Sequence, residues 1–119
     1  MAKDDYYVLV FKILTYLYAC LKGKTFYDPD VVEKTILQDV NEAYRAYILR
    51  HMSDDGLIEG YRYTHARGNV YISQSDLSEC QITPEGISFL KENSAMKKVL
   101  DFLKGNGDAI VSLFMRIMR

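Results

Sequence analysis

Apolar side chains recur at helical spacing near the start of the chain and predict a long helix over residues 6–21. The apolar stripe consists of Tyr6, Val10, Ile13, Leu14, Leu17 and Leu21. Gly23 follows, and a glycine commonly ends a helix. The opposite face is apolar too, with Tyr7, Phe11 and Tyr18. We therefore expect this second face to be covered, either by the C-terminal segment or by a second subunit.

Two prolines mark the starts of two further helices. Pro29 follows Asp28, and Pro84 follows Thr83. Asp and Thr cap helices well, and proline at the first helical position loses no hydrogen bond because its missing N–H would have no partner there. An acidic residue after each proline complements the helix dipole. The expected helices span residues 29–37 and 84–93.

Another helix is expected over residues 39–54. Asp39 and Glu42 have the spacing of a capping box, with Asp in place of Ser or Thr. The helix is expected to end before a turn at Asp55 and Gly56. With the short helix that precedes it, this segment is a candidate helix-turn-helix.

Beyond Gly56 the pattern changes from helical to strand-like spacing. One run contains Leu57, Ile58, Tyr61 and Tyr63, and a second contains Val70, Tyr71 and Ile72. The polar residues 64–69 between them include Gly68 and Asn69, which can supply the positive φ of a hairpin tip. We expect a β-hairpin here, followed by a short third strand at residues 81–82.

The C-terminal part of the chain predicts two more helices. The first covers residues 95–104, and the Gly-Asn-Gly sequence at 105–107 separates it from a last apolar helix over 108–119. We therefore divide the chain into a folded domain, 1–104, and a C-terminal apolar helix, 105–119, that serves packing or dimerisation. The residues expected to contact a partner or a second copy are Tyr7, Phe11, Tyr18, Ile110, Leu113, Phe114 and Ile117.

The composition is that of a single folded domain. The 119 residues are 49% apolar, and seven Gly and two Pro leave little material for linkers. The run 6–21 is too short for a membrane helix and contains Lys12, and the acidic start does not resemble a secretory signal. Cys20 and Cys80 lack paired spacing, which is typical of free thiols in a reducing compartment. We expect a cytoplasmic protein that does not enter a membrane.

No catalytic or metal-binding motif is recognisable in the sequence. There is no P-loop, no nucleophile elbow and no His-Glu-x-x-His. Cys20, His51, His65 and Cys80 lack the paired spacings of known zinc sites. We expect neither an enzyme nor a protein that holds a metal or a cofactor.

The sequence ITPEGISFLKENS at residues 82–94, together with MKK at 96–98 and FLK at 102–104, resembles the YjcQ family of small winged-helix proteins from Firmicutes and their phages. YLYACLK at residues 16–22 resembles the end of that family's long first helix. The resemblance implies an α+β winged helix-turn-helix with a three-helix core, a small antiparallel sheet with a wing, and additional C-terminal helices. It implies no activity and no site residue.

Winged helices commonly bind DNA with the second helix of the helix-turn-helix and with the hairpin. The residues here that would contact DNA are Asn41, Arg45 and Arg50 on the helix, and Arg62, His65, Arg67 and Asn69 on the hairpin. Our first hypothesis is therefore a DNA-binding regulator, bacterial or prophage-associated, that binds double-stranded DNA as a homodimer.

The charge distribution favours a second hypothesis. The net charge of the chain is −1, and residues 28–59 hold eight acidic and three basic side chains. Phosphate contacts supply most non-specific DNA affinity, so an acidic helix-turn-helix has to recover that attraction elsewhere. The alternative is a winged helix that binds another protein and no nucleic acid.

Overall fold

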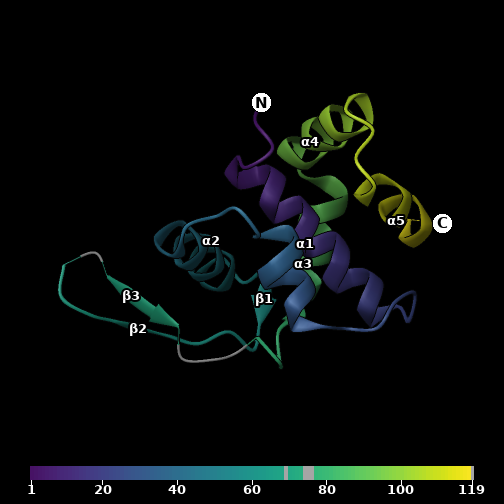
Figure 1. Cartoon of the computed structure of the whole chain (residues 1–119). Helices are drawn as coiled ribbons and strands as arrows, with labels where there is room; N and C mark the ends of the chain where they lie inside the picture. Colours follow the sequence, from purple (N-terminus) through teal and green to yellow (C-terminus); the bar gives the residue numbers. More distant parts are fainter. Residues whose placement is uncertain (69, 74–76, 119) are drawn as a thin grey trace.

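Helix α1, Tyr6–Leu21, runs through the centre of the protein, and the other helices pack around it (Figure 1). The computed structural model describes residues 1–68, 70–73 and 77–118. The remaining helical elements are η1 (Val31–Ile36), α2 (Glu42–Asp54), α3 (Pro84–Glu92), α4 (Ser94–Gly105) and α5 (Ile110–Ile117). The strands are β1 (Ile58–Glu59), β2 (Tyr63–His65), β3 (Tyr71–Ser73) and β4 (Gln81–Ile82).

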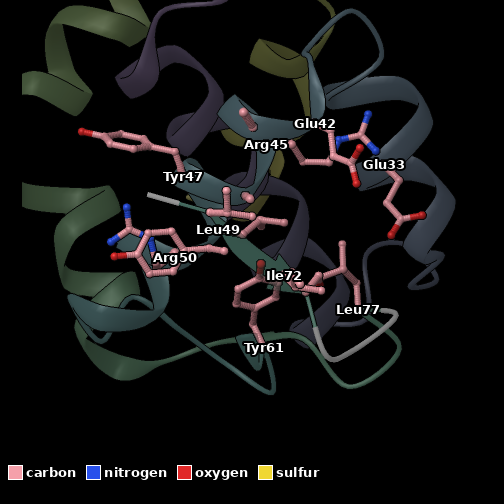
Figure 2. A pocket seen from close by; sticks show the side chains of 14 residues that line it. Glu33, Glu42, Arg45, Tyr47, Leu49, Arg50, Tyr61, Ile72 and Leu77 are labelled. Carbon is pink, nitrogen blue, oxygen red and sulfur yellow. The ribbon is translucent and has the colours of Figure 1, made fainter. Parts of the chain in front are cut away.

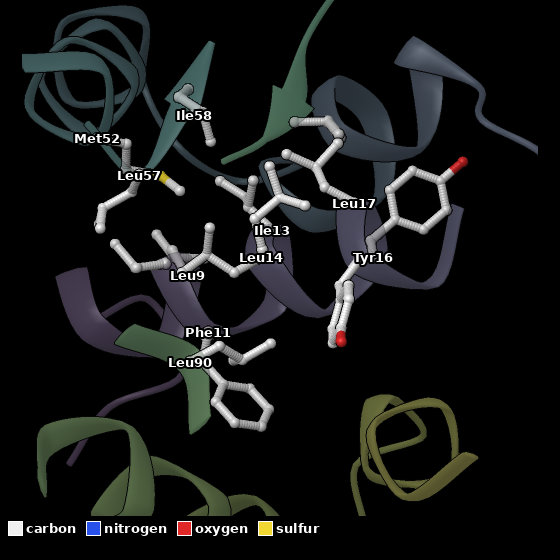
Figure 3. Packing of buried hydrophobic residues seen from close by; sticks show 14 of the residues in the cluster. Leu9, Phe11, Ile13, Leu14, Tyr16, Leu17, Met52, Leu57, Ile58 and Leu90 are labelled. Atoms are coloured by element: carbon white, nitrogen blue, oxygen red, sulfur yellow. The ribbon is translucent and has the colours of Figure 1, made fainter. Parts of the chain in front are cut away.

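The apolar pattern of α1 predicted its bounds correctly, and both of its faces are covered. Eleven of its sixteen residues are buried. Figure 3 shows Leu9, Ile13 and Leu14 on the side of α1 that faces Met52, Leu57 and Ile58. Phe11 lies on the other side with Leu90 of α3. The helix is therefore the centre of one core that reaches both halves of the chain.

Helix α5 closes the second face of α1 within the chain. The rings of Phe11 and Phe114 are 5.0 Å apart, and Ile117 is fully buried. The Nζ of Lys22 donates a hydrogen bond of 2.6 Å to the carbonyl of Ile117 at the end of α5. Of the two covers predicted for this face, the described structure contains the C-terminal segment.

The strands form two separate antiparallel pairs. Strand β1 pairs with β4, with Ile58 opposite Ile82, and β2 pairs with β3 as the predicted hairpin. The predicted third strand is confirmed, but the first apolar run is broken into β1 and β2 at Gly60. A Cβ there would lie 2.0 Å from the carbonyl oxygen of Glu79, and the φ of Gly60 is +84°. Only glycine permits this approach, which separates the hairpin from the first pair.

Two predicted helices differ from the structure, one in its type and one in its start. Residues 29–30 begin a helical turn as expected, but Val31–Ile36 is a π-helix in which the Leu37 N–H bonds the Val32 carbonyl at 3.0 Å. The capping prediction for Asp39 is wrong. Asn41 caps α2 instead, because the chain turns around the buried Val40 before the helix begins. Helix α2 therefore starts later than predicted.

The later helices match their predictions closely. Thr83 caps α3, with its Oγ1 accepting a 3.0 Å hydrogen bond from the Gly86 N–H. Asn93 caps α4 through a 2.8 Å bond from Ala95. Helix α5 is shorter than predicted, and Asp108 accepts from the Ile110 N–H just before it. The architecture as a whole is α+β with small antiparallel sheets and is compatible with a winged helix.

Candidate functional site

A groove of about 1110 Å³ lies between the outer face of α2 and the β2–β3 hairpin. Figure 2 shows Leu49 of α2 near Ile72 of β3, with Tyr61 close to them. Glu33, Glu42 and Arg45 lie at one end of the groove, and Arg50 and Tyr47 lie at the other. The groove thus has an apolar centre and charged ends.

The hairpin is attached to α2 by a cation–π contact. The guanidinium carbon of Arg50 lies 3.8 Å from the centre of the Tyr71 ring on β3. The ring of His65 stacks on Tyr71 with centres 4.7 Å apart and planes 15° apart. A second link is the hydroxyl of Tyr63, which donates a 2.6 Å hydrogen bond to Asp54. These contacts hold the hairpin, which forms one wall of the groove, close to α2, which forms the other wall.

The other arginine of α2 is also bound within the chain. An Nη of Arg45 donates a 3.1 Å hydrogen bond to the Leu37 carbonyl, in the turn before α2. The Nε atoms of Arg45 and Arg50 are buried, and neither has an acceptor among the described residues. Both side chains are half-buried. The two arginines of α2 that were predicted to contact DNA therefore help to build the groove.

The remaining residues predicted to contact DNA are spread over the surface. Asn41 is exposed, but its Oδ1 accepts a 2.9 Å hydrogen bond from the Tyr44 N–H as the α2 cap. Arg62, His65 and Arg67 are exposed on and beside the hairpin, and the described lining of the groove does not include them. The Nε2 of His65 lies 2.6 Å from the Gly68 carbonyl. Asn69 falls outside the described residues.

Apolar side chains at the groove are exposed to an unusual degree. Val70 is 55% exposed, Ile72 is 51% exposed and Tyr47 is 48% exposed. The apolar pattern placed Val70 and Ile72 in the hairpin but did not mark them as binding residues. The sequence did contain a signal for this exposed surface. Residues 70–72 are three successive apolar residues, and because side chains alternate along a strand, they place apolar side chains on both faces of the hairpin. A two-stranded hairpin can pack only one of these faces on the rest of the protein, so the other stays exposed.

Two carboxylates, those of Glu33 and Glu42, line the groove at the same end as Arg45. Neither Glu33 nor Glu42 forms a salt bridge with any residue that the structure describes. Glu42 is exposed, and Glu33 is half-buried. Since Arg45 and Arg50 are engaged within the chain and neither carboxylate forms a salt bridge with a described residue, Glu33 and Glu42 offer hydrogen-bond acceptors at this end of the groove.

Tyr47, which lines the groove, also belongs to a tyrosine patch, which we define as Tyr6, Tyr7, Tyr44 and Tyr47. The ring of Tyr47 lies 6.1 Å from Tyr6 and 6.5 Å from Tyr44. Burial and then the charge of Asp55 raise the pKa of Tyr6 to about 12. Burial and then the charges of Asp4 and Asp5 raise the pKa of Tyr44. The patch is therefore under the influence of nearby negative charge.

Most of the residues predicted to contact a partner or a second copy lie inside the chain. Phe11, Tyr18, Phe114 and Ile117 are buried, and Ile110 and Leu113 are half-buried. Tyr7 is the exposed member of the set, at 47%. The buried residues make their contacts within one copy of the chain, so Tyr7 is the residue of this set that is most accessible to another molecule.

The described residues show no metal site and no helix suited to a bilayer. No group of three or more His, Cys, Asp or Glu side chains among them could hold a metal ion. None of the described helices combines the length and the apolar character needed to cross a membrane. Burial raises the pKa of the Cys80 thiol to about 12 and raises that of Cys20 as well, which disfavours the reactive thiolate.

These features define a small α+β protein with a groove between a helix and a hairpin. Residues 11–108 match the family model described as YjcQ protein, and the chain belongs to the YjcQ family. The match includes the ITPEGISFLKENS segment that carries the resemblance in the sequence. No curated protein and no solved structure matches the chain.

Proposed function

We propose that this protein is a winged-helix interaction module that binds another protein through the groove between α2 and the hairpin. The order of helices followed by a hairpin and further helices supports the winged-helix assignment. The observation that carries the binding role is the groove itself, where Ile72 and Val70 remain half-exposed beside an apolar centre. Apolar surface of this kind is typical of protein–protein contacts. The role is binding, without catalysis or a cofactor, in the cytoplasm.

The chemistry of α2 argues against base reading by this helix. A recognition helix needs free donors on its outer face, such as arginines that pair with guanine. Arg45 is bonded to the Leu37 carbonyl, and Arg50 is stacked on Tyr71. Glu42 on the same face would repel phosphate. A partner protein fits this mixture of apolar and acidic groups better than a duplex does.

One observation favours DNA as a second candidate. The hairpin lies beside α2 at the edge of the molecule (Figure 1), and Arg62 and Arg67 are exposed beside and on it. A wing with exposed arginines can contact the phosphate backbone without help from the recognition helix. In that case the protein would bind duplex DNA with little sequence preference.

A random-peptide display selection on the full chain tests the main proposal. We expect selected peptides to bind in solution with micromolar dissociation constants. Ile72→Asp should weaken that binding at least tenfold, because it places a charge in the apolar centre of the groove. Phe26→Asp is the matched control, since Phe26 is 96% exposed and is not among the groove residues. A selection without enriched peptides, or equal effects of the two variants, would refute the groove as a binding site.

Fluorescence anisotropy with random-sequence duplex DNA at two salt concentrations tests the second candidate. We expect no binding at micromolar protein. Binding that falls steeply with salt, and that Arg62→Ala with Arg67→Ala weakens, would instead support DNA contact by the hairpin and overturn the main proposal.

A further inference from the structure

Both the groove and the tyrosine patch present groups that attract a cation. Glu33 and Glu42 are carboxylates without a salt bridge to any described residue, whereas the cations on the same helix are engaged. A partner group that binds at the Glu33 end of the groove lies next to carboxylate oxygens, which accept hydrogen bonds. Donors with positive charge, as in Lys and Arg side chains, are the groups that pair with carboxylates.

The aromatic surface points to the same partner chemistry. Tyr7 and Tyr47 are each about half exposed, and the faces of such rings attract cations. Arg50 already shows this behaviour within the chain, with its guanidinium 3.8 Å from Tyr71 and 5.7 Å from Tyr47. The carboxylates that act on Tyr6 and Tyr44 strengthen the preference for a cation over this surface.

The wider charge distribution extends this preference over the whole helix-turn-helix. Residues 28–59 carry eight acidic and three basic side chains, and most of these acids are exposed. Of the bases, Lys34 pairs with Asp30 at 3.4 Å, and the two arginines are engaged as described. An approaching basic segment is therefore attracted, and an acidic segment or a phosphate backbone is repelled.

The size and the apolar centre of the groove indicate how long the bound segment is and that it contains an apolar side chain. A volume of about 1110 Å³ exceeds the space of one side chain and is suited to a short peptide segment. Leu49, Tyr61 and Ile72 can surround one apolar side chain in the middle of the groove. A binding segment gains most from an apolar anchor that removes water from such a centre.

We infer that the groove, with the adjoining tyrosine patch, binds a basic and amphipathic segment of a partner protein. An apolar side chain of this segment lies between Leu49 and Ile72. A Lys or Arg lies against Glu33 and Glu42, and further basic residues lie over Tyr47 and Tyr7. This inference rests on the proposed function and adds the chemistry of the partner.

The composition of the peptides that are enriched in the display selection tests the inference. We expect an apolar residue with Lys or Arg nearby, and weaker binding as the salt concentration rises. A synthetic peptide in which each Lys and Arg is replaced by Gln should bind at least tenfold less tightly. Enrichment of acidic or uncharged peptides would overturn the inference while leaving the proposed function intact, provided that Ile72→Asp still abolishes their binding.

Uncharged variants of Glu33 and Glu42 test whether a basic side chain of the partner lies against these two residues. Glu33→Gln with Glu42→Gln keeps the shape of the groove and should weaken the selected basic peptide about tenfold and reduce its salt dependence. Glu85→Gln with Glu92→Gln is the matched control, because it removes two exposed carboxylates on α3 and should change the affinity less than twofold. If both pairs have the same effect, the charge of the groove does not select the partner. A selection that yields no peptide overturns the proposed function itself.

Discussion

Thr83 connects three parts of the chain through a single residue. Its Oγ1 accepts a hydrogen bond from the Gly86 N–H and donates one to the Gly56 carbonyl in the turn after α2. Its own N–H donates to the Leu57 carbonyl at 3.1 Å. Three residues on, a Cβ at Gly86 would lie 2.2 Å from the Leu57 carbonyl oxygen. The segment that carries the family resemblance is thus the junction at which α3 meets the end of α2.

Replacing Thr83 by Ala should lower the free energy of unfolding by about 1–2 kcal/mol. The variant loses the helix cap and leaves the Gly56 carbonyl without its donor. Thr83→Ser keeps the hydroxyl and should remain within about 0.5 kcal/mol of the wild type. Urea unfolding followed by circular dichroism gives both values. Equal losses for Ala and Ser would show that the methyl group, and not the hydroxyl, makes the junction.

At the scale of elements, the entry into α5 depends on one carboxylate. Asp108 accepts a hydrogen bond from the Ile110 N–H and pairs with Lys12 of α1 at 3.0 Å. Burial alone would raise its pKa, but the Ile110 N–H and Lys12 outweigh burial and lower the pKa of Asp108 below its ordinary value of 3.8. The ionised form is therefore favoured in the folded protein, and α5 is tied to α1 through it.

Because the folded protein lowers this pKa, the stabilisation is present above the pKa of the unfolded chain and is lost as the pH falls through the folded pKa. Asp108→Asn retains an oxygen for the cap and removes only the charge. We expect it to cost up to about 1 kcal/mol at pH 6–7 and progressively less as the pH falls below the ordinary pKa of 3.8. Asp101→Asn, an exposed aspartate on α4, is the control. Urea unfolding of the three proteins across this range checks the prediction, and a pH-independent cost would contradict it.

At the scale of the whole molecule, α5 contributes to the core that α1 organises. Phe114 and Ile117 are buried, and the ring of Phe114 packs on Phe11 in the middle of α1. The division into residues 1–104 and 105–119 therefore runs through a shared core. We expect the two parts to unfold together, because removing α5 would expose Phe11 and its neighbours.

Phe114→Ala should lower the free energy of unfolding by about 3 kcal/mol, the cost of removing a large side chain from a core. Met115→Ala is the matched control on the same helix, since Met115 is 37% exposed, and it should cost less than about 1 kcal/mol. Calorimetry of both variants should show one transition that moves to lower temperature for Phe114→Ala. A transition for Phe114→Ala that coincides with that of Met115→Ala would mean that α5 is an appendage and not part of the core.

The helices were predictable wherever short-range interactions decide their limits. The apolar stripe of α1 and the cap at Thr83 act over three or four residues, so the printed sequence contains all the information they need. Predictions failed where distant contacts compete. Asn41, and not Asp39, caps α2 because the burial of Val40 sets the preceding turn. Gly60 breaks a strand-like run because the backbone at Glu79 passes close to it.

The candidate site depends on contacts between distant segments more than the limits of the helices do. The sequence marked Arg45 and Arg50 as surface cations from their type and their place on a helix, which is sound for an isolated helix. The tertiary structure brings the Leu37 carbonyl to the first and the Tyr71 ring to the second. Neither contact follows from local spacing, since the hairpin docks on α2 across a separation of 21 residues between Arg50 and Tyr71.

By itself, the sequence determined most of the helical segments, the hairpin and the family, because periodicity, caps and turn residues act locally. Only the tertiary structure decided which charges remain free and where apolar surface is left open. Docking of the hairpin on α2 engages Arg50, and the turn before α2 engages Arg45. Glu33 and Glu42 form no salt bridge with a described residue, and Ile72 stays half exposed. Both features depend on contacts between segments that are distant in the sequence. The same contacts bring the acidic helix α2 and the hairpin together and so form the groove.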